Sequence, residues 1–127
     1  KGVVRGDEAA DLVAAGVDGI VVSNHGGRQV DNAVAALDAL PEVVDAVGDR
    51  ATVLFDSGIR SGADVAVAMA LGARAVLLGR PWVYGLAVDG AAGVEHVLRA
   101  TLAELQITAE LMGKDVADLD GSDVTRR

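Results

Sequence analysis

The feature that most constrains the fold of this chain is the alternation of three short apolar runs with helical patterns. The apolar runs cover residues 19–23, 52–56 and 75–79. Their aliphatic residues stand at consecutive positions, which is typical of parallel strands covered on both faces. Since helical patterns separate these runs and the turns between them are short, we expect parallel strands joined by right-handed crossovers.

The predicted helices end at recognisable stop signals. Gly16, Gly48, Gly72 and Gly113 each follow a helical pattern, and glycine readily adopts the left-handed conformation that ends many helices. A capping-box-like start opens the segment at Ser61. The helices that we predict span residues 7–15, 41–47, 61–71, a short segment from Pro81, and about 92–112.

The length of the chain limits how much of a fold it can build. A complete (β/α)8 barrel needs about 250 residues, and the chain has 127. It holds three strands and a possible fourth that would end at Lys1. We therefore predict an α/β fold that is half of a (β/α)8 TIM barrel, with three to four parallel strands, over residues 1–113. Residues 114–127 are Asp-rich and lack a clear period, so we expect a partly ordered acidic tail.

Composition excludes several classes of partner. The formal net charge of −8 argues against nucleic acid or an anionic membrane as the main partner, although a few arginines can still attract a small anion locally. The absence of cysteine excludes disulfides and thiolate metal sites, and we predict no metal site. No apolar run approaches the ~20 residues of a membrane span. We expect a cytoplasmic protein.

Two glycine-containing loops resemble a phosphate site. In parallel α/β folds, ligands bind at the carboxyl ends of the strands. Gly58 and Gly79 would let the backbone approach an anion there, while Arg60 and Arg80 would supply fixed positive charge. A helix beginning at Ser61 would add its positive end. Ordinary turn glycines and surface arginines are the alternative, but two such loops on successive strands favour a site.

The loop after the first strand carries the only histidine at a strand end. His25 lies between a buried strand and two glycines, which favours a functional residue over a structural histidine. Arg28 could bind a carboxylate bidentately, or could simply be a solvated loop arginine. His96 lies in the long helical pattern, where a surface position is expected.

The run Ser23-Asn24-His25-Gly26-Gly27-Arg28-Gln29 resembles the signature of the FMN-dependent α-hydroxy-acid dehydrogenase/oxidase family, which includes lactate oxidase, lactate monooxygenase and glycolate oxidase. The resemblance extends to about Gly113, through Lys1-Gly2, residues 38–41, residues 56–60 and Gly79-Arg80. It implies that the half-barrel is the C-terminal half. Ser57 stands where many members have glycine, and its loop is most similar to the lactate monooxygenase branch.

This resemblance also implies a cofactor, a reaction and residue roles. FMN would accept reducing equivalents from an L-2-hydroxy acid, lactate- or glycolate-like, giving the 2-oxo acid or its decarboxylation product. His25 would be the general base, and Arg28 would bind the substrate carboxylate. The residues implied to bind FMN are Lys1 near the flavin N1/C2 carbonyl, Ser23 at the flavin, Asp56 at the ribityl chain, and Ser57, Gly58, Arg60, Gly79 and Arg80 around the phosphate.

The implied partners follow from what the chain lacks. The family's other half supplies strands under the flavin and an active-site tyrosine, a role that Tyr84 does not match. We expect the missing N-terminal half or self-association to complete the site, a homo-oligomer when complete, and an inactive isolated chain. Two alternatives stay open: another FMN- or phosphate-binding barrel enzyme, whose families lack the seven-residue run, and a half-barrel fragment that binds FMN phosphate or a partner without turnover.

Overall fold

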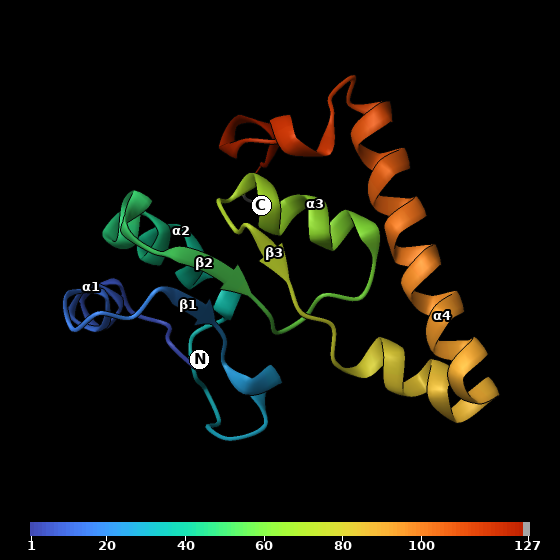
Figure 1. Cartoon of the computed structure of the whole chain (residues 1–127), viewed down its shortest axis with the longest axis horizontal. Helices are drawn as coiled ribbons and strands as arrows, with labels where there is room; N and C mark the ends of the chain where they lie inside the picture. The colour runs from blue at the N-terminus through green and yellow to red at the C-terminus, as the bar shows by residue number, and fades with distance from the viewer. Residues whose placement is uncertain (126–127) are drawn as a thin grey trace.

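The computed structural model describes residues 1–125, which build one parallel sheet with helices (Figure 1). Its strands are β1 (Gly19–Val22), β2 (Thr52–Phe55) and β3 (Ala75–Val76), in the order β1-β2-β3. Gly19 pairs with Thr52, and Leu54 pairs with Ala75, both in parallel register. The predicted parallel strands are therefore confirmed, although each ends one to three residues before the predicted limit.

The first residues of the chain pair with the outer edge of β1. Val3 forms an isolated parallel bridge with Val22, and the Ser23 amide donates to the Val3 carbonyl at 3.2 Å. The prediction that a fourth strand ends at Lys1 is wrong by two residues, because the backbone pairing continues to Val3. This pairing fixes Lys1 beside the carboxyl end of β1.

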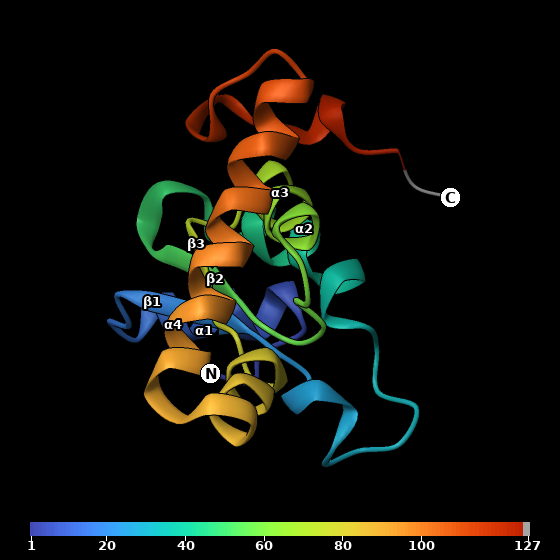
Figure 2. The same ribbon diagram turned by 90° about the vertical axis from the view of Figure 1, so that its right-hand side faces the viewer.

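Helices cover one face of the sheet. α1 (Gly6–Ala14) packs on α2 (Ala36–Val47), and α3 (Gly62–Ala70) packs on α4 (Arg80–Leu111), as Figures 1 and 2 show from two sides. The strand residues on the helix side are buried, whereas the alternate ones are exposed or half-buried. Cover on both faces of the sheet was predicted. Among the described residues only one face is covered, since the helices that pack on the strands all lie on that side. The buried strand residues are Ile20, Val22, Val53 and Phe55.

Helix α2 begins earlier than predicted. The proline signal placed its start at Pro41, but the helix begins at Ala36 and Pro41 lies inside it. Burial of an apolar face outweighs the hydrogen bond that an internal proline removes. The residues of that face recur at helical spacing: Ala36, Ala39, Leu40, Val43 and Val47.

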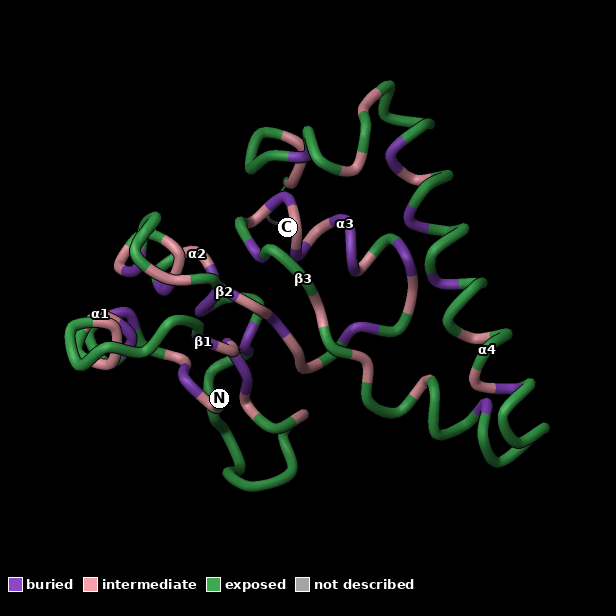
Figure 3. Tube along the Cα trace, viewed as in Figure 1, coloured by how far each residue is buried: buried purple, intermediate pink, exposed green. Residues whose placement is uncertain are grey.

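Helix α4 consists of two helical arms joined at a kink. Asp89 and Gly90 have non-helical backbone angles, with φ of −148° and 54°. A short helix followed by a long one was predicted, and this division is confirmed. The arms meet at Gly85 and Gly93, where a Cβ on Gly93 would lie 2.0 Å from the Gly85 carbonyl oxygen. Beyond Gly93, the buried residues of the long arm, Thr101, Leu105 and Ala109, recur at helical spacing along one side of it, and this arm packs against α3 (Figure 3).

The described part of the acidic tail folds against α3. It forms two 3-10 turns, Val116–Asp118 and Gly121–Asp123, and its Leu119 is buried in the core. Lys114 pairs with Asp120 and Asp123, which also raises the pKa of this lysine through their hydrogen bonds. Turns of three residues are too short to give a period in the sequence. Residues 126–127 of the predicted tail lie outside the described residues.

Candidate active site

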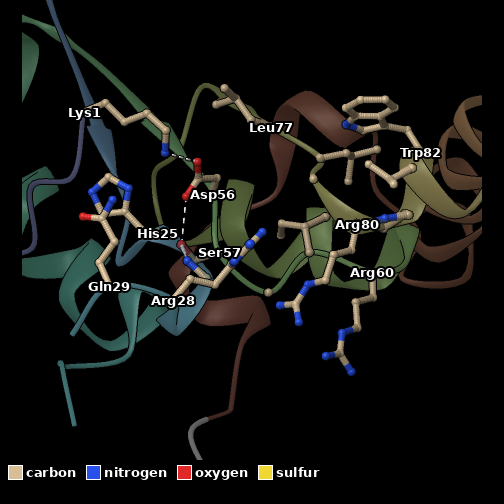
Figure 4. A pocket seen from close by; sticks show the side chains of 17 residues that line it. Lys1, His25, Arg28, Gln29, Asp56, Ser57, Arg60, Leu77, Arg80 and Trp82 are labelled. Atoms are coloured by element: carbon tan, nitrogen blue, oxygen red, sulfur yellow. Dashed lines mark hydrogen bonds and ion pairs between the residues drawn. The ribbon is translucent and has the colours of Figure 1, made fainter. Parts of the chain in front are cut away.

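A cavity of ≈ 680 Å³ opens at the carboxyl ends of the strands (Figure 4). Its volume falls within the range of about 300–1,000 Å³ that is common for ligand sites. Among the described residues, four cationic side chains and one carboxylate, that of Asp56, line it. The cavity is therefore locally positive in a chain of net charge −8. The cations are Lys1, Arg28, Arg60 and Arg80.

The predicted site residues converge on this cavity. Nine of the ten line it, and the tenth, Ser23, lies buried next to Lys1 with 1% of its surface exposed. In Figure 4, Lys1 and His25 lie on one side, Arg60 and Arg80 on the other, and Asp56 between them. The two arginines predicted for phosphate thus lie at the end away from Lys1, whereas the Ser57 hydroxyl, also predicted for the phosphate region, lies beside Asp56 and the loop of His25. Their roles stay predictions.

Lys1 lies at the centre of a polar network. Its ammonium group donates to the Ser23 hydroxyl at 2.8 Å and forms an ion pair with Asp56. Partial burial raises the pKa of Asp56, but hydrogen bonds from Lys1 and the neighbouring hydroxyls outweigh this effect, so the pKa lies below its usual value. Asp56 therefore stays a carboxylate and holds the Lys1 ammonium at the cavity wall.

His25 adopts a conformation that is uncommon for a residue with a side chain. Its φ is 58°, in the left-handed region. The imidazole lies against the backbone of Gly2, where an added Cβ would come within 2.8 Å of His25 Nε2. Glycine is therefore favoured at position 2 both by its own φ of 94° and by the space that the imidazole occupies. This role of Gly2 was not predicted, because only the folded backbone brings the two residues together.

The arginine end of the cavity has space for an anion. Arg60 and Arg80 flank it, and a Cβ added to Gly58 or Gly79 would meet nothing within 4 Å. The Arg80 side chain also reaches back to the loop after β1, since a Cβ on Gly26 would lie 3.7 Å from Arg80 Nη2. Glycine backbone and guanidinium groups around one open space suit a phosphate.

Carboxylate side chains cap the start of α3. The Asp64 carboxylate accepts from the Arg60 and Ser61 amides at 2.8 and 2.9 Å, which confirms the capping box. Glu104 of α4 accepts from the Gly62 amide at 2.8 Å. Protein carboxylates therefore occupy these three donors, and the contribution of this helix end to an anion site stays a prediction. By contrast, α4 begins after Gly79 with no side-chain cap and opens at the cavity.

Eight further residues line the cavity that were not predicted as site residues, and two large apolar ones lie near the arginines. Trp82, 38% exposed, and Leu77 line the cavity beside the arginines. The position of Trp82 just after Gly79-Arg80-Pro81 was the available signal, because the turn into α4 directs it to the cavity. Within residues 1–125, no group of three His, Asp or Glu side chains could hold a metal ion, and no helix is long and apolar enough to cross a membrane.

Curated proteins similar to this chain are named as oxidases or dehydrogenases of hydroxy acids. An FMN-dependent alpha-hydroxy acid dehydrogenase of Schizosaccharomyces pombe is 58% identical, over 89% of this chain and 28% of that protein. An L-lactate oxidase of Nostoc is 54% identical, over 96% of this chain and 34% of its own length. The chain thus spans about a third of the length of these relatives.

Solved structures show the same fold. A structure of (S)-mandelate dehydrogenase, a monotopic membrane protein, superimposes with a TM-score of 0.94 at 40% identity, covering 99% of this chain and 34% of that one. Mandelate oxidase with (S)-2-phenylpropionate gives 0.86 at 48% identity, covering 89% and 34%. These similarities confirm that the chain is part of a (β/α)8 barrel. The model of the FMN-dependent dehydrogenase family matches residues 1–126, and the chain belongs to that family.

Proposed function

We propose that this chain, together with the rest of its barrel, forms an FMN-dependent site that oxidises an L-2-hydroxy acid of the lactate or glycolate class to the 2-oxo acid or its decarboxylation product. The observation that carries the proposal is one cavity with His25, Arg28 and Lys1 near one end and two arginines at the other. Family membership supports the cofactor, and the names of the relatives support the substrate class.

The residues present fit FMN. The open, glycine-lined space between Arg60 and Arg80 suits the phosphate of FMN. The absence of side chains at Gly58 and Gly79 would let this phosphate approach their N–H groups closely. Lys1, held by Ser23 and Asp56, would place a positive charge at the polar edge of the flavin ring. When bound, FMN supplies the electron-accepting chemistry, which protein side chains lack.

The substrate end needs a base and an anchor. Arg28 presents a planar fork that matches a carboxylate and would fix the orientation of the hydroxy acid. The imidazole of His25, which lines the same cavity, would accept the substrate proton as the general base. The half-exposed inner face of the sheet supports the prediction that the N-terminal half of the barrel, or a second copy, completes the site.

The alternatives differ in what they predict for L-lactate. A fragment that binds FMN phosphate without turnover would hold flavin that lactate cannot reduce, and another phosphate-binding barrel enzyme would not use lactate. Homo-oligomerisation and a cytoplasmic location stay predictions. Association with a membrane is the alternative to a cytoplasmic location, because one of the similar structures is of a monotopic membrane protein.

The test is anaerobic addition of L-lactate to the complete FMN-loaded protein while the flavin absorbance at about 450 nm is recorded. Bleaching of that band supports the proposed reaction. His25→Gln should leave the flavin bound but abolish bleaching, because only the base is lost. Full-rate bleaching in that variant would remove His25 from the mechanism, and a flavin that never bleaches in the unmodified protein would refute the proposed function.

A further inference from the structure

Side-chain oxygens hold four consecutive backbone amides of the loop that carries His25. The Ser57 hydroxyl accepts from the amides of Asn24 and Gly26, each at 3.1 Å. Between them, the His25 amide donates to Ser23 Oγ at 3.1 Å. The Gly27 amide donates to the Asn24 side chain at 3.2 Å. Ser57 is the one of these acceptors that comes from another strand, so it joins the loop after β1 to the loop after β2.

The hydrogen-bonding capacity of Ser57 is used up by the protein. A serine hydroxyl has one proton to donate and two lone pairs to accept with. Its proton goes to Asp56 Oδ1 at 2.8 Å, and its lone pairs go to the two amides. Figure 4 shows the resulting chain from Ser57 through Asp56 to Lys1. Ser57 would therefore contribute to a phosphate through its backbone, while its hydroxyl serves the loop.

Backbone strain points the same way. Both His25 and Ser57 are in the left-handed region, with φ of 58° and 83°. Residues with a side chain avoid this region, and they remain in it only when surrounding contacts enforce it. Glycine would adopt the backbone angles of Ser57 without strain. A serine is thus the less stable choice at this position unless its hydroxyl contributes something, and the three hydrogen bonds above are that contribution.

We propose that Ser57 is a positioning residue for His25. Its hydroxyl fixes the amides on either side of His25, so that the imidazole stays packed on Gly2 near Lys1. The same hydroxyl donates to Asp56, so one side chain aligns the base and the Lys1–Asp56 pair. This inference rests on the proposed function, in which His25 is the base.

The test compares Ser57→Gly and Ser57→Ala in the complete FMN-loaded protein. Both variants lose the hydroxyl, but Ser57→Gly also relieves the backbone strain, so it should be destabilised less than Ser57→Ala. We expect kcat for L-lactate to fall roughly tenfold or more in both, because the base is displaced. FMN affinity should change by less than about fivefold, since Lys1 still pairs with Asp56 after the hydroxyl is lost. Ser122→Ala, which removes an exposed hydroxyl in the tail, is the matched control.

A readout independent of turnover is the NMR titration of the His25 imidazole, whose resonance is identified by its loss in His25→Gln. The titration midpoint or the line width should change in both Ser57 variants and not in Ser122→Ala. Unchanged kcat and unchanged titration in both Ser57 variants would overturn the inference. So would a large loss of FMN affinity with an unchanged titration, because the hydroxyl would then act on the phosphate. An altered titration in a protein that lactate never reduces would support the positioning role while refuting the proposed function.

Discussion

Replacing Gly2 by alanine should separate the stability of the fold from the action of its base. The new Cβ would lie 2.8 Å from His25 Nε2, whereas ordinary contact begins at 3.4 Å, so the imidazole must retreat by roughly 0.6 Å. A side chain can make that movement at little cost in stability. A displacement approaching 1 Å can, however, lower a rate by up to ~10²-fold. We therefore expect kcat in Gly2→Ala to fall by about 10- to 100-fold.

The matched control for this prediction is Gly16→Ala. Gly16 has φ of 97°, close to the 94° of Gly2, and a Cβ there would meet nothing within 4 Å. Both variants should lose about 1–2 kcal/mol of unfolding free energy, the approximate cost of left-handed backbone for an alanine. Thermal or urea denaturation measures the stability change, and anaerobic flavin reduction by L-lactate measures the rate. Equal rates in the two variants would refute the contact between Gly2 and the imidazole as a determinant of catalysis.

Three other predictions follow from the site and its supports. Arg80→Lys should weaken FMN binding about tenfold or more in a fluorescence titration, because lysine lacks the bidentate fork, whereas Arg74→Lys outside the cavity should not. In thermal or urea denaturation, Gly93→Ala should lower the unfolding free energy by about 1–3 kcal/mol, since its Cβ would lie 2.0 Å from a backbone oxygen. Gly121→Ala is the control and should be nearly neutral, because the nearest atom to its Cβ lies at 3.9 Å. Because the pKa of Asp56 is lowered in the fold, ionised Asp56 should stabilise the protein above the unfolded pKa of about 3.9, and this stabilisation should be lost as the pH falls through the folded pKa. The difference in unfolding free energy between the protein and its Asp56→Asn variant should therefore shrink in denaturation series from pH 7 to about pH 3. A constant difference would contradict this prediction.

The parts of the fold that the sequence predicted well depend on neighbouring residues. Consecutive aliphatic runs and glycine stop signals located the strands, and Ser61 with Asp64 located the start of α3. The site could be placed because parallel strands bring their carboxyl ends to one edge, whatever the details of the loops. That single rule put His25 and the phosphate-binding candidates on the same cavity.

What the sequence could not predict depends on residues far apart in the chain. Glu104 accepts from the Gly62 amide across 42 positions, and no local pattern signals that this amide is already bonded. The start of α2 was misplaced for a related reason, because burial against the sheet keeps Pro41 inside the helix. In each case a tertiary contact decides between local alternatives that the sequence leaves nearly equal.

Ser57 combines both kinds of information. Its place in the loop after β2 follows from local pattern, and so does its expected neighbourhood to a phosphate. Its φ of 83° and the direction of its hydroxyl toward Asn24 and Gly26 follow only from how two successive strands pack. The hydrogen bonds to these two amides offset the backbone strain of Ser57. They form only when the loop around His25 is in place. The same hydrogen bonds therefore offset the strain of Ser57 and fix the loop that carries His25. A substitution in either loop should change the conformation of the other.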